Sequence, residues 1–137
     1  MNNNVRTYRD LIVWSDSKLL AEKVYNVTKY LPSEERFGLA SQMQRAAVSI
    51  PSNIAEGEQR NSTKDYIRFL YTSRGSLAEL LTQLEITKDL YPEVESLIIP
   101  LINSYNILGK KLNNLIISLK RRLKLKREAY KKKKLLK

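Results

Sequence analysis

Hydrophobic residues recur along most of the chain at intervals of three and four, the spacing that places side chains on one side of an α-helix. Four such segments follow one another, at about residues 9–30, 34–58, 63–90 and 93–123. None of them alternates apolar and polar residues as a half-buried β-strand does. The pattern therefore predicts an all-α protein.

Short connections rich in turn and cap residues separate the predicted helices. Pro32 ends the first helix, because the residue before a proline resists the helical conformation, and Ser33 is expected to cap the second. Residues 61–63 form the next turn, and residues 91–92 close the third helix. Long helices joined by short turns pack best as antiparallel neighbours, so the expected fold is an up-down-up-down four-helix bundle.

The second predicted helix contains Pro51, which lacks the amide proton that would bond to the Ala47 carbonyl. A proline inside a helix costs about 3 kcal/mol unless the chain bends or that carbonyl finds another partner. The polar residues on both sides keep one helical phase, so we expect one kinked helix rather than two short ones. Gly57 is expected to cap its C-terminus, and Gly75, inside the third helix, to allow the close approach of another backbone.

A polar stripe runs past the proline. Arg45, Ser49, Asn53 and Glu56 are separated by steps of four, four and three, which places them on one side of a helix. In one interpretation they form a buried polar network with the third helix or a neighbouring subunit, with Glu79 as the partner of Arg45. In the other, Arg45 and Asn53 contact RNA or a ligand. Small apolar residues lie beside the stripe, so we favour the structural interpretation.

Composition excludes several classes of function. The 137 residues fit one domain, and they include no Cys and no His. Disulfides, thiol chemistry, imidazole bases and the usual zinc ligands are therefore excluded, and the glycine motifs that bind phosphate do not occur. We expect no enzyme activity, no cofactor and no metal. Apolar runs are too short for a signal peptide or a membrane span, so we expect a cytoplasmic protein with no membrane partner.

The formal net charge of +11 is concentrated at the C-terminus. Residues 120–137 hold eleven Lys or Arg and one acidic residue, a net of +10, which leaves +1 for residues 1–119. A general preference for lysine would have made the rest of the chain basic too, so we predict contact with a polyanion, with a solubilising tail as the alternative. The candidate nucleic-acid-binding residues are Lys120, Arg121, Arg122, Lys124, Lys126, Arg127, Lys131, Lys132, Lys133 and Lys134.

The apolar stripe of the fourth predicted helix has no successor after Leu123, since Lys126 and Arg127 occupy the next core positions. We therefore predict a bundle over residues 9–123, a flexible segment over residues 1–8, and a frayed or disordered basic tail over residues 124–137. The eight tyrosines could in principle stack on bases. The favoured interpretation instead places four of them at core edges and subunit interfaces, namely Tyr25, Tyr66, Tyr71 and Tyr105.

Residues 45–57, with the sequence RAAVSIPSNIAEG, resemble the signature of bacterial four-helix bundle proteins encoded within intervening sequences of 23S ribosomal RNA genes. Trp14 and several residues of the third and fourth helices extend the resemblance over about residues 8–120. It implies a four-helix protomer and a homo-oligomer, since members of this family and the related accessory proteins of diversity-generating retroelements assemble as homopentamers. The lysine-rich extension departs from the family by continuing past its usual end.

The tail and the resemblance together predict a non-enzymatic, homopentameric accessory protein that binds nucleic acid, with RNA favoured over DNA. The retroelement relatives are basic, bind nucleic acid and engage a reverse transcriptase. The alternative is therefore a protein-interaction scaffold that recruits a partner such as a reverse transcriptase, the tail serving only solubility. Association with anionic membranes ranks last, because the chain carries no lipidation signal.

Overall fold

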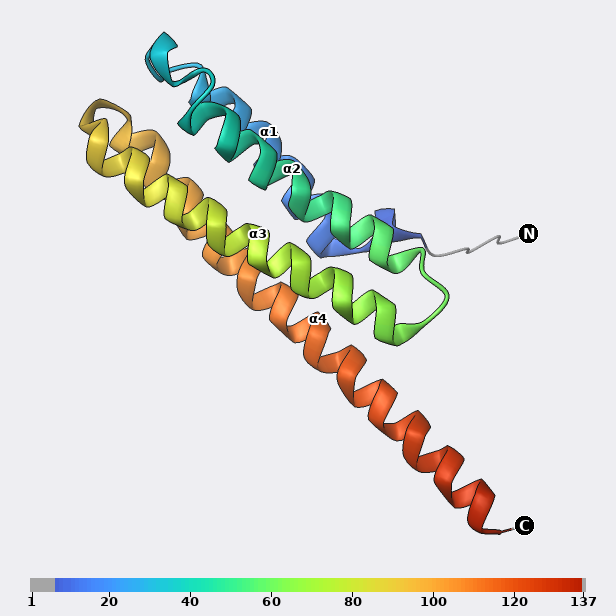
Figure 1. Cartoon of the computed structure of the whole chain (residues 1–137). Coiled ribbons are helices and arrows are strands. Elements are labelled where there is room, and N and C mark those ends of the chain that lie inside the picture. Colours follow the sequence, from blue (N-terminus) through green and yellow to red (C-terminus); the bar gives the residue numbers. More distant parts are fainter. Residues whose placement is uncertain (1–6, 137) are drawn as a thin grey trace.

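The computed structural model describes residues 7–136, which contain four α-helices and no strand. Their order is η1 (Tyr8–Asp10), α1 (Ile12–Thr28), η2 (Ser33–Glu35), α2 (Leu39–Glu58), α3 (Thr63–Leu90), η3 (Pro92–Val94) and α4 (Glu95–Leu135), where η marks a 3-10 turn. The helices lie side by side with alternating direction, and α4 continues past the other three (Figure 1). The predicted all-α four-helix bundle is confirmed.

One hydrophobic core runs through the bundle, and every helix contributes one side to it. In α4 the last buried residue is Leu119 and Leu123 is partly buried, so the core ends there. None of the described helices is both long enough and apolar enough to cross a membrane. The largest side chains that are less than 2% exposed are Val24, Met43, Ile50, Ile54, Leu70, Leu80, Leu84, Thr87, Ile98, Tyr105, Leu108 and Leu112.

Helix boundaries agree with the sequence where a cap is clear. The third helix spans Thr63–Leu90 as predicted, and the Ser62 hydroxyl caps it by accepting a hydrogen bond from the Asp65 amide at 3.1 Å. The second helix begins at Leu39 rather than residue 34, because Gly38, with φ −108° and ψ −116°, interrupts the helical path. The prediction that Ser33 caps the second helix was therefore wrong.

The N-terminal segment predicted to be flexible covers residues 1–8. Residues 1–6 of it lie outside the described residues, and Tyr8 begins a 3-10 turn.

Pro51 is buried within a single continuous α2, as expected, while the kink itself stays a prediction. Side chains donate to the two carbonyls that precede the proline. The Ser49 carbonyl accepts from Asn53 Nδ2 at 2.8 Å, and the Ile50 carbonyl accepts from Ser73 Oγ, on α3, at 3.0 Å. The backbone around the proline is thus hydrogen-bonded to its own helix and to its neighbour.

Gly57 does not end α2. It is buried one residue before the end, with no positive φ, and a Cβ added there would lie 2.7 Å from Phe69 Cβ and 3.1 Å from Tyr66 Cδ1. Its role is therefore close packing of α2 on α3, not capping. Gly75 is exposed, and an added Cβ would meet nothing within 4 Å, so the close approach predicted there is absent from the described protomer.

The two glycines predict opposite effects of alanine. Gly57→Ala should lower the free energy of unfolding by about 1–3 kcal/mol, because the new methyl group overlaps Phe69 next to its backbone. Gly75→Ala should raise it by about 0.5–1 kcal/mol, since an exposed helical glycine costs backbone entropy. Urea unfolding of both variants measures the difference. Equal shifts would contradict the packing described here.

Two tyrosine hydroxyls differ in their environment. The Tyr105 hydroxyl is buried in α4 without a hydrogen-bond partner among the described residues, and burial raises its pKa. Tyr91 donates to Glu35 Oε2 at 2.7 Å and so ties the α3–α4 connection to the α1–α2 connection. That hydrogen bond is the main cause that raises the pKa of Tyr91 to about 12.

Removing each hydroxyl should therefore act in opposite directions. Tyr105→Phe should raise the free energy of unfolding by about 1 kcal/mol, because it removes a buried donor that has no partner. Tyr91→Phe should lower it, because the bond to Glu35 is lost. Thermal unfolding monitored by circular dichroism checks both, and a Tyr105→Phe variant less stable than the wild type would reveal a bond to this hydroxyl.

Candidate nucleic-acid interface

Residues 120–135 of α4, here called the tail helix, project beyond the bundle (Figure 1), and all of them except the partly buried Leu123 are exposed. At a rise of about 1.5 Å per residue its sixteen residues span roughly 24 Å. The sequence predicts a frayed or disordered tail over residues 124–137, whereas α4 is helical to Leu135 in the structure. Lys137 lies outside the described residues.

Helix continuity explains this difference. Once a helix is nucleated, each further residue adds one backbone hydrogen bond, so extending α4 needs no new nucleus. Lys, Arg and Leu dominate the tail helix and are good helix formers, and no Gly or Pro follows Gly109. The sequence interpretation gave more weight to the missing core stripe and to repulsion within residues 131–134.

All ten predicted cations of the tail helix are exposed, and none forms an ion pair within residues 7–136. Half of them follow one another at steps of four and three, which places them in one row along the helix. The others cover the remaining sides, so phosphates can approach from any direction. The row, named the cation row below, consists of Lys120, Lys124, Arg127, Lys131 and Lys134.

The tail helix begins against α3, where four side chains form what is called here the Tyr71 patch. Lys120 Nζ donates to Tyr71 Oη at 2.8 Å. The guanidinium carbon of Arg74 lies 4.6 Å from the centroid of the Tyr71 ring, and Arg74 Nη1 donates to Asn113 Oδ1 at 3.2 Å. Of these four residues, only Lys120 was predicted from the sequence as a binding residue. Tyr71 and Arg74 are three residues apart, a spacing that makes them neighbours on a helix and that the sequence analysis did not consider.

The polar stripe forms a shorter network than the one predicted. Ser49 Oγ lies 2.9 Å from Ser76 Oγ of α3, and Asn53 Nδ2 donates to Ser49 Oγ at 3.0 Å. These three partly buried side chains join α2 to α3 without any charge. Within the protomer, Ser49 and Asn53 thus form a polar contact with α3, as in the structural interpretation.

The charged members of the predicted network do not join it. Arg45 is exposed and forms no ion pair in the described residues. Glu79 is also exposed and accepts from Gln83 Nε2 at 3.2 Å, while Glu56 pairs with Arg60 at 2.9 Å. The predicted pairing of Arg45 with Glu79 was thus wrong within the protomer. Both side chains are long enough to keep their charges in water, which avoids the cost of burying them.

Comparison with known proteins identifies the family. Residues 9–114 match the 23S rRNA-intervening sequence protein family. The chain belongs to this family. The resemblance predicted from residues 45–57 is thereby confirmed, whereas the relation to retroelement accessory proteins stays a prediction. No curated protein matches the chain.

A solved structure supports the assignment. It is that of a protein of unknown function from the S23 ribosomal protein family of Bacteroides thetaiotaomicron, with 26% sequence identity and a TM-score of 0.70. The alignment covers 77% of this chain and 98% of that one. The family match ends at residue 114, so the whole tail helix of this 23S rRNA-intervening sequence protein lies beyond it.

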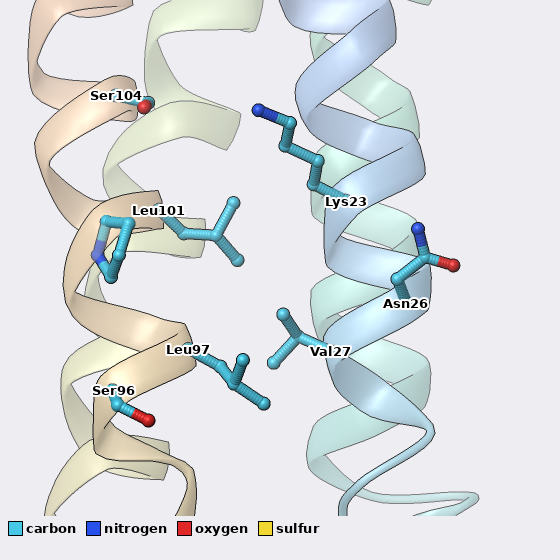
Figure 2. Close-up of a pocket in the computed structure, with 8 residues that line it drawn as sticks. Lys23, Asn26, Val27, Ser96, Leu97, Leu101 and Ser104 are labelled. Carbon is cyan, nitrogen blue, oxygen red and sulfur yellow. The ribbon is translucent and has the colours of Figure 1, made fainter.

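A second surface of this family member lies between α1 and α4, within the matched residues. A cavity of 280 Å³ separates the two helices, and Figure 2 shows Val27, Leu97 and Leu101 pointing toward one another across it. Next to it is a cavity of 210 Å³, where Leu19 is 52% exposed and Ile107 is 55% exposed. We call this surface the open seam. It leaves apolar side chains of both helices in contact with solvent.

Proposed function

We propose that this protein is a non-enzymatic, homo-oligomeric accessory protein of the cytoplasm that binds RNA through its tail helix. The observation that supports RNA binding is the exposure of ten cations on one projecting helix, none of which forms an ion pair within residues 7–136. Lys and Arg attract phosphates regardless of sequence and release counterions when they bind. No preformed pocket is needed for such a contact.

Stability does not account for these cations. Beyond Leu123 the tail helix buries no side chain, so its composition adds nothing to the core. Like charges four residues apart, such as Lys120 with Lys124 and Arg127 with Lys131, destabilise a helix. A charge arrangement that weakens the free protein favours a function in binding a polyanion.

Self-association is the second part of the proposal, and the resemblance to pentameric relatives makes a pentamer the expected state. The open seam supports it, because contiguous exposed apolar side chains often mark protein interfaces. Several copies would bring several tail helices to one RNA. Their combined effective concentration would strengthen a contact that is weak for one tail.

The same seam is the observation that favours the second candidate function, a scaffold that recruits a protein such as a reverse transcriptase. In that case the tail helix would serve only solubility. A partner captured from cells that stays bound after nuclease treatment, and also after loss of the tail, would support this alternative.

Removal of residues 124–137 should strongly weaken salt-sensitive RNA binding, because it removes seven of the ten candidate cations. It should leave the melting temperature nearly unchanged, since every described residue that it removes is exposed. If about five tail cations contact phosphates of single-stranded RNA, the binding constant of the full chain should fall with salt at a log–log slope near −3.5. Fluorescence anisotropy in a salt series measures both effects.

A matched control tests whether position matters or only net charge. Replacing residues 131–134 by Gln should weaken RNA binding strongly, whereas replacing Lys18, Lys29, Lys88 and Lys110 by Gln removes the same charge from the bundle and should weaken it little. Equal losses in the two variants would contradict a specific role of the tail helix.

The oligomer prediction uses two isoleucines of α4 with equal exposure. Ile107 lines the open seam and is 55% exposed, whereas Ile117 lies outside it and is 54% exposed. Ile107→Asp should dissociate the assembly, because it places a charge in an apolar interface, and Ile117→Asp should not. Light scattering after gel filtration gives the masses. A monomeric wild type would refute the assembly and leave the RNA proposal standing.

A further inference from the structure

The Tyr71 patch combines an aromatic ring with cations where the tail helix leaves the bundle. The Arg74 guanidinium lies over the ring at 4.6 Å, within the range of a stacked cation. Lys120 Nζ is 2.8 Å from Tyr71 Oη but 5.6 Å from the ring centroid, so the ammonium lies at the hydroxyl edge rather than over the ring. In this patch the Arg74 guanidinium thus lies over the Tyr71 ring, and the Lys120 ammonium lies beside the Tyr71 hydroxyl.

Both helices hold Arg74 in place. The Tyr71 ring supports it from α3, and Asn113 Oδ1 accepts its hydrogen bond from α4 at 3.2 Å. Neither Arg74 nor Lys120 pairs with an acidic side chain among residues 7–136, so their charges are free to meet an anion. An arginine plane held in this way is a surface on which an unpaired RNA base stacks.

The cation row begins at this patch. Its first member is Lys120, and the next four follow along the same side of the tail helix, about 5–6 Å from one member to the next. An RNA strand whose phosphates follow the row would reach Arg74 and Tyr71 at its bundle end. Only a single strand has base faces free to stack there, because a duplex buries them between neighbouring pairs.

We infer that the Tyr71 patch is a stacking site for an unpaired base of single-stranded RNA whose phosphates lie along the cation row. This inference rests on the proposed RNA binding and adds a preference for unpaired nucleotides over a duplex. Tyr71 and Arg74 supply the stacking surface, Asn113 positions Arg74, and Lys120 joins the patch to the phosphate track.

Two variants separate stacking from charge. Tyr71→Leu keeps an apolar side chain at a partly buried position and removes the ring, while Arg74→Lys keeps the charge and removes the plane. Each should weaken binding to a labelled ten-nucleotide oligouridine about tenfold, the scale of one lost base–aromatic contact, with an unchanged salt slope. Tyr71→Phe should bind like the wild type, and so should Tyr25→Leu, which changes a tyrosine of α1 that is 44% exposed.

An abasic RNA of the same length supplies the phosphates without the bases. Wild type, Tyr71→Leu and Arg74→Lys should bind it equally, and the wild type should bind a ten-base-pair duplex no better than either variant does. Wild-type affinity of both variants for oligouridine would overturn the stacking site. If Tyr71→Leu lowers the melting temperature, its weaker binding could reflect partial unfolding. The test of the stacking site then rests on Arg74→Lys, which changes an exposed residue. A wild type without salt-sensitive binding to any of these RNAs would instead refute the proposed function itself.

Discussion

The close contact between α2 and α3 at Gly57 is the constraint on which the rest of the structure depends. Any side chain at that position would overlap Phe69, so the two helices can approach there only because the residue is a glycine. Farther along the same interface, Ser73 bonds to the Ile50 carbonyl and Ser76 lies within hydrogen-bond distance of Ser49. Small residues and short hydroxyl bonds thus hold α2 and α3 in one register, and a slip of either helix would break all three contacts.

Because α3 is fixed against α2, it also determines the course of α4. Tyr71 lies beside Lys120, and Arg74 beside Asn113, so positions on α4 descend as those on α3 ascend, as in an antiparallel hairpin. In this register, the last turns of α4 that contribute to the core lie at the level of the Tyr71 patch. The tail helix therefore leaves the bundle along its axis, and the cation row starts beside an aromatic ring instead of at an isolated helix end.

The sequence predicts the fold because its signals are local. The spacing of apolar residues and the turn at residues 61–63 locate α3, and the signature in residues 45–57 identifies the family. Long-range geometry was not accessible in this way. Gly57 and Gly75 both interrupt helical patterns, and only the structure distinguishes the packed glycine from the exposed one. The Tyr71 patch joins residues far apart in the chain, so composition revealed its Lys120 but not its partners.

Folding and charge are carried by different parts of the chain. The buried side chains end at Leu119, the family match ends at residue 114, and a net charge of +10 lies in residues 120–137, after both limits. Since burial stabilises the bundle and the tail helix contributes none beyond Leu123, the number of cations is free to vary without changing the fold. Repulsion between these cations destabilises the tail helix of the free protein, and an anionic ligand would weaken that repulsion. If the tail helix binds RNA as proposed, binding and the stability of this helix would be thermodynamically linked, because neutralised lysines lose the repulsion that works against their helical spacing.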